Sequence, residues 1–189
     1  MATYRITYSD FDVSRLENAI VRFPEGQPMV PQGNRPMILP GKIEIRSSDG
    51  DLFRLRAGSE FHIENTLEGL QPVISGEVFA INAASWWKST RSCHTCKSHS
   101  SPPLQILMRP HNSNTDEYLL AMGSTVIHDF DTSGRHFVIC SLEEGHKAYV
   151  SHNPDVPMGP SRYSVQIDRM SDSDWDYVHQ EYLDNRLWM

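Results

Sequence analysis

Short segments in which polar and apolar residues alternate, separated by turns, constrain this chain more than any other feature of its sequence. Residues 42–46 and 52–56 both alternate with a period of two and flank the turn residues 48–51, which include Asp49-Gly50. A period of two places successive side chains on opposite faces of a strand, and an Asp-Gly turn between two such segments is typical of a β-hairpin. The same pattern predicts further strands at 60–64, 72–75, 77–81, 104–108, 118–122, 125–130, 136–142, 147–151 and 163–167.

This pattern spans residues 41–168 and predicts one mainly β domain, either a short-stranded β-solenoid or a β-sandwich. Residues 1–40 form a separate N-terminal segment that ends in a proline-rich arm. Prolines at 24, 28, 31, 36 and 40 exclude a helix there and favour an extended chain. Upstream of the arm, residues 14–23 are compatible with a short helix or with a strand.

The C-terminal tail, residues 169–189, predicts an amphipathic helix over about residues 172–186. Ser171 and the acidic residues after it suit a helix start, and Trp175, Val178 and Tyr182 recur on one stripe. Aromatic residues are enriched at the centres of protein interfaces, and the chain holds several in polar surroundings. We therefore expect a partner-binding surface formed by Trp86, Trp87, Trp175, Leu187 and Trp188.

Residues 82–103 interrupt the strand pattern and predict a long Cys/His-containing loop. Within it, Cys93, Cys96 and His99 have a spacing that a tetrahedral Zn²⁺ ion accepts from one loop, and His94 is a further candidate ligand. The fourth ligand of such a site could come from His94, Cys140, His111 or a second chain. The alternatives are a disulfide, two free thiols in a solvated loop, or a redox-active thiol pair.

A second cluster of metal-binding residue types is spread over residues 128–146 and raises the hypothesis of a cupin-like metalloenzyme. Neighbouring His128 and Asp129 should point to opposite faces of a strand, so they cannot both be ligands. His136 and Cys140 are four apart and should share a face. Partly exposed strand histidines with no metal are the simpler interpretation.

Composition narrows the classes of partner. The net charge is −7, with no basic stripe, which argues against nucleic acid as the main partner. No apolar run is long enough for a transmembrane helix, and the N-terminus has no apolar signal-peptide core. We expect a cytoplasmic protein or one on the cytoplasmic face of a membrane, peripherally associated with a membrane complex; an envelope-side location would need another export route.

Two stretches together resemble the FecR-type domain, the envelope-side module of iron-citrate-type signalling regulators. Residues 43–63, IEIRSSDGDLFRLRAGSEFHI, look like that family's succession of strand, D-G-S turn, strand, small-G-S turn and strand. Residues 118–134, YLLAMGSTVIHDFDTSG, and 137–150, FVICSLEEGHKAYV, are similar to its later strand pairs. Met122-Gly123-Ser124 stands where the family usually has Arg-Gly-Thr. The resemblance covers about residues 38–152 and implies a compact stack of short strands that acts by protein–protein contact, without catalytic residues.

The leading hypothesis is therefore a non-catalytic FecR-like β module that serves as an accessory, structural or regulatory subunit of a larger protein assembly. No G-x-S-x-G, H-E-x-x-H or P-loop pattern is present in the sequence. The alternatives are a zinc-binding or redox-active protein that uses the Cys93/Cys96/His99 loop, and the cupin-like metalloenzyme. Zinc is the only cofactor for which the sequence offers ligands.

Overall fold

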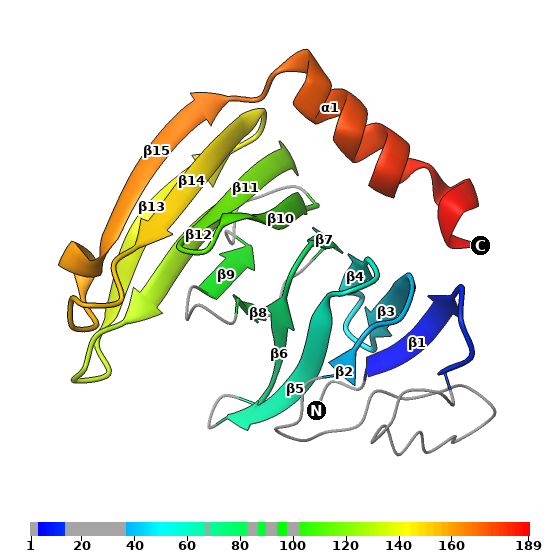
Figure 1. The fold of residues 1–189 in the computed structure, drawn as a ribbon, viewed down its shortest axis with the longest axis horizontal. Coiled ribbons are helices and arrows are strands. Elements are labelled where there is room, and N and C mark those ends of the chain that lie inside the picture. The colour runs from blue at the N-terminus through cyan, green and yellow to red at the C-terminus, as the bar shows by residue number, and fades with distance from the viewer. Residues whose placement is uncertain (1–3, 14–36, 67–68, 83–86, 90–93, 98–102) are drawn as a thin grey trace.

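The computed structural model describes residues 4–13, 37–66, 69–82, 87–89, 94–97 and 103–189. Two twisted β-sheets face each other without closing into a barrel, and a helical tail lies along one side (Figure 1). The prediction of a mainly β chain is confirmed. The two-sheet arrangement fits the sandwich alternative of the sequence analysis.

The first sheet has eight described strands in the order β1–β3–β4–β7–β10–β11–β14–β15, all antiparallel. Their bounds are β1 Tyr4–Ser9, β3 Ile43–Ser47, β4 Leu52–Leu55, β7 Val78–Ile81, β10 Gln105–Asn112, β11 Thr115–Met122, β14 His146–His152 and β15 Tyr163–Arg169.

The second sheet has seven described strands in the order β13–β12–β9–β8–β6–β5–β2, with β6 and β8 parallel and the other neighbours antiparallel. Their bounds are β2 Met37–Ile38, β5 Glu60–Thr66, β6 Gly69–Ser75, β8 Trp87–Ser89, β9 His94–Lys97, β12 Ser124–Phe130 and β13 His136–Glu143.

The hairpin expected around Asp49-Gly50 is present as β3 and β4, which pair from Ile43 with Leu55 to Arg46 with Leu52. Gly50 adopts a φ of 94°, a conformation that costs glycine little and other residues much. The turn therefore sets the pairing register of β3 and β4. In this register, alternate side chains of the hairpin lie on opposite faces of the sheet.

Residues 82–103 correct one sequence expectation, because this segment is more than an excursion between strands. It supplies β8 and β9, which lie in the middle of the second sheet between β6 and β12. Both strands are short and rich in polar residues, so hydrophobic alternation could not reveal them. Their position depends on hydrogen-bonded pairing with β6 and β12, which tertiary structure provides and local sequence does not.

The main core lies between the two sheets. The first sheet contributes inward-facing residues such as Ile45, Phe53 and Leu120, and the second contributes residues such as Phe61 and Ile127. Alternate side chains along each strand reach this core, as the period of two predicts.

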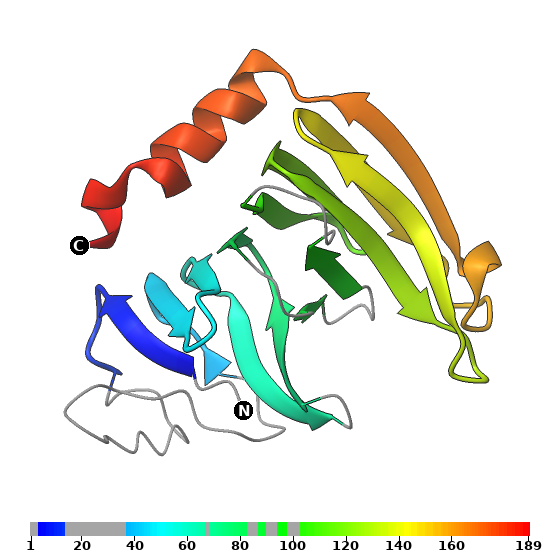
Figure 2. The same ribbon diagram turned by 180° about the vertical axis from the view of Figure 1, so that it is seen from behind.

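A second apolar cluster lies on the outer face of the first sheet and is covered by the tail. Its buried members are Phe79, Leu107, Leu119, Ala121, Met170, Val178, Tyr182 and Trp188. The tail begins with α1, Asp172–Val178, continues through one π-helical turn, His179–Leu183, and ends in a 3₁₀ turn, Asn185–Trp188. It runs along one side of the molecule in both views (Figures 1 and 2). Central strands of the first sheet are consequently buried on both faces.

The start of the tail matches its sequence. The Ser171 hydroxyl accepts a hydrogen bond from the Asp174 amide, and the Asp174 carboxylate accepts one from the Ser171 amide, forming a complete capping box. None of the helices in the described ranges is long and apolar enough to cross a membrane.

Candidate functional sites

The border strand β15 is the most exposed regular element in the described part of the molecule. It follows β14 at the end of the first sheet, and six of its seven residues are exposed. Val165 and Ile167 retain 36% and 46% of their accessible surface. They stand opposite Val150 and Ala148 of β14, which belong to the main core, so the two aliphatic side chains lie on the inner face of the first sheet. The apolar inner face of the first sheet therefore extends beyond the part that the second sheet covers.

A buried carboxylate ties the start of β15 to the second sheet. Asp129 of β12 is buried, and it accepts a hydrogen bond from the Tyr163 hydroxyl. Burial raises the pKa of Asp129 against the opposing effect of this hydrogen bond. The contact holds β15 in place at one end, while the segment with Val165 and Ile167 stays uncovered.

A pair of histidines lies on the outer face of the second sheet. The His128 and His136 ring centroids are 4.5 Å apart, and Phe130 packs edge-on against both rings. His128 is completely buried although it points away from the core, whereas His136 is exposed. Burial, and then the neighbouring His136, lower the pKa of His128 to about 4. The expectation of partly exposed strand histidines is thus corrected for His128.

The strand β9 brings part of the Cys/His segment into the second sheet beside β12. His94 stands directly opposite His128 in the β9–β12 ladder, and Cys96 stands opposite Val126. Cys93 and His99, the other residues of the expected zinc loop, lie outside the described residues, so that hypothesis stays a prediction.

The expected faces of the 128–140 cluster are partly confirmed and partly corrected. His128 and Asp129 do point to opposite faces. His136 and Cys140 do not share one, because a β-bulge in β13 between their pairing positions shifts the register. Cys140 instead enters the main core, where burial raises the pKa of its thiol to about 11. A cupin-like site would gather its ligands inside a closed barrel, whereas these sheets stay open and both histidines face outward.

The structure also corrects the proposed aromatic partner surface. Trp87 is fully buried in the main core against Phe53, and Trp188 is buried in the outer cluster. Trp175 and Leu187 are half-buried against that cluster, and Trp86 lies outside the described residues. The tail does dock, but it docks on its own first sheet.

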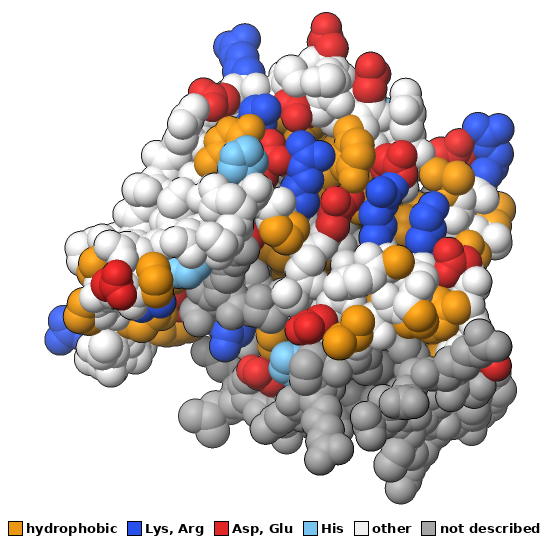
Figure 3. Space-filling model, in the orientation of Figure 1, with side chains coloured by type: hydrophobic (Ala, Val, Ile, Leu, Met, Phe, Trp, Pro, Cys, Tyr) orange, Lys and Arg blue, Asp and Glu red, His pale blue; other side chains and the backbone are white. Residues whose placement is uncertain are grey.

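A charged seam joins the tail to the sheet, and it consists of Glu44, Arg54, Arg56, Glu77, Arg109, Glu117, Lys147, Asp174 and Glu181. At its centre, Glu77 accepts hydrogen bonds from the hydroxyls of Tyr177 and Tyr182. Figure 3 shows positive and negative side chains interleaved on this side of the molecule. The seam attaches the tail to the sheet. Because its positive and negative side chains are interleaved, it produces no electrostatic field of one sign that would attract a charged ligand.

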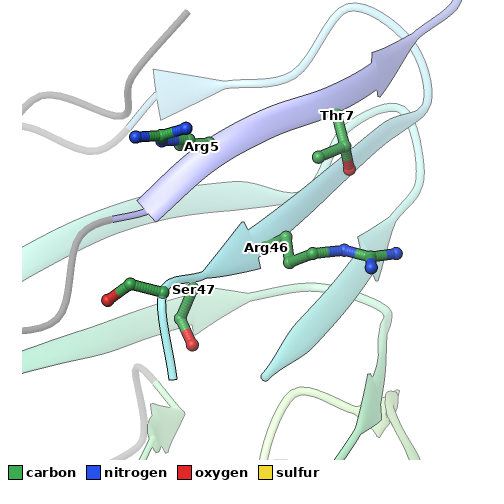
Figure 4. A pocket seen from close by; sticks show the side chains of 5 residues that line it. Arg5, Thr7, Arg46 and Ser47 are labelled. Atoms are coloured by element: carbon green, nitrogen blue, oxygen red, sulfur yellow. The ribbon is translucent and has the colours of Figure 1, made fainter. Parts of the chain in front are cut away.

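Two shallow hollows lie along the N-terminal strands. One, of about 450 Å³, is lined by Arg5, Thr7, Arg46, Ser47 and Ser48. The two arginines point away from each other in it, so no focus of positive charge forms (Figure 4). The other, of about 530 Å³, is lined by residues of both signs, including Asp10 and Lys42. Neither hollow has the convergent polar groups of an active site.

Comparison with known proteins found no match: no protein-family model matches the chain, and no curated protein matches it.

Proposed function

We propose that this chain is a non-catalytic β module that serves as a subunit of a protein assembly and docks through its border strand β15. The observation that carries the proposal is the exposure of Val165 and Ile167 on a seven-residue border strand. Border strands offer unpaired backbone groups to other chains, and natural proteins usually blunt them with charges, prolines or a covering element. The FecR-like strand pattern over residues 38–152 supports the same role, because that family acts by protein contact.

The occupant that β15 fits best is a second copy of itself. In an antiparallel pair centred on Gln166, Val165 of one copy stands opposite Ile167 of the other, twice over. The same register sets Ser164 opposite Asp168 and Tyr163 opposite Arg169, so no like charges meet. A two-fold pair of this kind is closed and self-complementary, and it joins two eight-stranded sheets into one.

One substitution tests the surface, and the chain offers a matched control. Ile167→Lys places a charge at the centre of the proposed contact, while Ile38→Lys makes the same change on β2, the border strand at the far end of the other sheet. Ile38 retains 66% of its accessible surface and Ile167 retains 46%, so both changes are made at exposed positions. Oligomeric state is measured by sedimentation velocity over a wide range of protein concentration.

We expect a concentration-dependent dimer in the wild type and in Ile38→Lys, and a monomer in Ile167→Lys. One strand pair covers a small area, so the dimer should be weak and should dissociate on dilution. A wild type that stays monomeric at the highest concentration would overturn the proposal. So would a dimer that Ile167→Lys and Ile38→Lys form equally well.

A further inference from the structure

The backbone hydrogen bonds at the two ends of β15 show which of its edge groups face outward. The Met170 amide donates to the Gly145 carbonyl at 2.9 Å. The Asn153 amide donates to the Arg162 carbonyl, also at 2.9 Å. In an antiparallel ladder, residues that bond to the neighbouring strand alternate with residues that do not. Even-numbered residues of β15 therefore bond to β14, whereas the amides and carbonyls of its odd-numbered residues face outward.

This alternation restricts how a second copy can pair with β15. Antiparallel strands exchange hydrogen bonds between residues whose backbone groups face each other, so odd-numbered residues must stand opposite odd-numbered ones. The register centred on Gln166 meets this condition and sets Tyr163 of one copy opposite Arg169 of the other, twice over. Registers centred on Val165 or Ile167 also meet it, but they separate Tyr163 from Arg169. The choice of register therefore depends on what these two side chains offer each other.

Tyr163 lies on the inner face of the first sheet, where it contacts two residues of the second sheet. Its hydroxyl donates to the Asp129 carboxylate, and its ring centroid lies 6.0 Å from that of Phe137. Asp129 is buried, while both aromatic rings are half-buried. A phenol that donates a hydrogen bond to a carboxylate has a more electron-rich ring, because hydrogen bonds in a low-dielectric setting polarise their partners. Such a ring attracts a cation to its face.

Arg169 supplies a cation at the other end of the same strand. It is exposed, and in the part of the chain that the structure describes its side chain makes no hydrogen bond or ion pair. It shares the inner face with Tyr163, because an even number of residues separates them, and the next residue, Met170, belongs to the outer cluster. Directly opposite residues have Cβ atoms about 4.5–5.5 Å apart, and a guanidinium within about 6 Å of a ring centroid is attracted to it. Arg169 of a second copy can therefore reach the Tyr163 ring.

From this geometry we infer that Arg169 of each copy docks on the Tyr163 ring of the other, in a site that the contact with Asp129 holds in place. The inference rests on the proposed docking through β15, and it adds the residue pair that selects both the partner and the register. Arginine and tyrosine are enriched among the residues that contribute most to interfaces, and two-fold symmetry uses this contact twice. The aliphatic side chains at the centre of the strand tolerate several registers, whereas this contact forms in one.

Sedimentation velocity of the full chain with Arg169→Gln tests the contact. The position is exposed, so the fold should tolerate the change. Arg186→Gln is the matched control, because it removes the same charge from the C-terminal 3₁₀ turn, where 87% of the arginine side chain is exposed. We expect the wild type and Arg186→Gln to dimerise alike. Arg169→Gln should dimerise about tenfold more weakly, because the symmetric pair loses two cation–π contacts.

A cysteine at the centre of β15 tests the register. Gln166→Cys places two thiols directly opposite each other across the two-fold axis, so oxidised glutathione should link two copies through a disulfide. Ser164→Cys is the control, because in this register its two thiols lie four residues apart, about 13 Å along the strands, which is too far for a disulfide. The wild type, which has three cysteines of its own, is oxidised alongside as the baseline.

The possible failures are distinguishable. If Arg169→Gln and Arg186→Gln dimerise equally while Ile167→Lys is monomeric, docking through β15 stands and this inference is overturned. It is also overturned if Gln166→Cys does not link above the baseline, or if Ser164→Cys links as readily. A wild type that stays monomeric at the highest concentration overturns both proposals.

Discussion

Arg54 and Arg46 both pair with the Glu44 carboxylate, and they show how strongly burial determines the contribution of an ion pair to stability. Arg54 is buried, donates from Nε to Glu44 at 2.9 Å and from Nη2 to the Asn185 side chain at 2.8 Å, and also donates to the Tyr182 carbonyl. Arg46 approaches Glu44 at 3.6 Å, but 55% of its side chain is exposed. An exposed ion pair gains little because water screens it, whereas removing one partner of a buried pair leaves the other charge without compensation.

We therefore predict that Arg54→Ala lowers the free energy of unfolding by about 3–5 kcal/mol. Arg46→Ala, which removes the exposed member of the same cluster, should cost less than about 1 kcal/mol. Urea denaturation of both variants at neutral pH measures the difference. Equal losses would contradict the burial argument.

The charged seam also contains residues whose burial the local sequence does not reveal. Arg54 and Glu44 alternate with apolar residues along β4 and β3, which is the pattern of solvent-facing positions on a half-buried sheet. The tail then covers that face, and these charges become buried. Glu44 is the cross-strand neighbour of Arg54 in the predicted hairpin, but the other two partners of Arg54, Tyr182 and Asn185, lie more than a hundred positions away, so the local sequence does not reveal that Arg54 is buried.

Among the elements, the C-terminal helix was the best predicted, because its capping box and its apolar stripe are local. Ser171, Asp174, Val178 and Tyr182 all have the roles that their spacing indicates. The sequence does not show where the helix docks, and the aromatic residues of the tail therefore predict a partner surface although they cover the first sheet. Strand β9 is the opposite case: it has no apolar alternation, and its ladders with β8 and β12 make it a strand.

Attachment of this helix should depend on pH through Lys147 and Asp174, which approach to 2.8 Å. Burial tends to raise the pKa of Asp174, but hydrogen bonds from Lys147 and Ser171 outweigh it and leave the pKa lowered. The hydrogen bond to Asp174 raises the pKa of Lys147. The stability from Asp174 is thus complete above its unfolded pKa of about 3.9 and is lost as the pH falls through the lower folded value. The stability from Lys147 is complete below its unfolded pKa of about 10.4 and is lost as the pH rises through the folded value.

Asp174→Asn removes the charge pair. The free energy of unfolding of this variant should therefore fall furthest below that of the wild type between about pH 5 and pH 9, and the two should converge in acid. Asp176→Asn on the exposed side of the same helix is the control and should change stability little at any pH. A deficit for Asp174→Asn that stays constant down to strongly acidic pH would show that lost packing or capping, and not charge, is responsible.

For the whole molecule, the sequence could predict the class of fold far better than the layering, although the eleven expected strands leave out β1, β2, β8 and β9 of the described structure. Turn residues and a period of two depend only on neighbours in the chain. The cover on the outer face of the first sheet, by contrast, comes from the last nineteen residues.

This layering predicts that the tail stabilises the whole sandwich and not only itself. Phe79 and Leu107 face the outer cluster, while their neighbours Ala80 and Ile106 face the main core, so the same strands belong to both layers. Trp188 retains 4% of its accessible surface and stacks on Tyr182, whereas the adjacent Met189 retains 87%. Removing the indole leaves a cavity against the first sheet, and loss of a large buried aromatic costs about 3–5 kcal/mol.

We therefore expect Trp188→Ala to lower the free energy of unfolding by that amount when far-UV circular dichroism, which reports mainly the sheets, follows urea denaturation. The transition should remain single, with an unchanged dependence on urea, because the two layers unfold together. Met189→Ala removes an exposed side chain from the next position and should change stability by less than about 0.5 kcal/mol. The opposite result is also recognisable. If proteases remove the tail of Trp188→Ala while the sheets unfold at the wild-type urea concentration, the tail is an appendage and the two cores are independent.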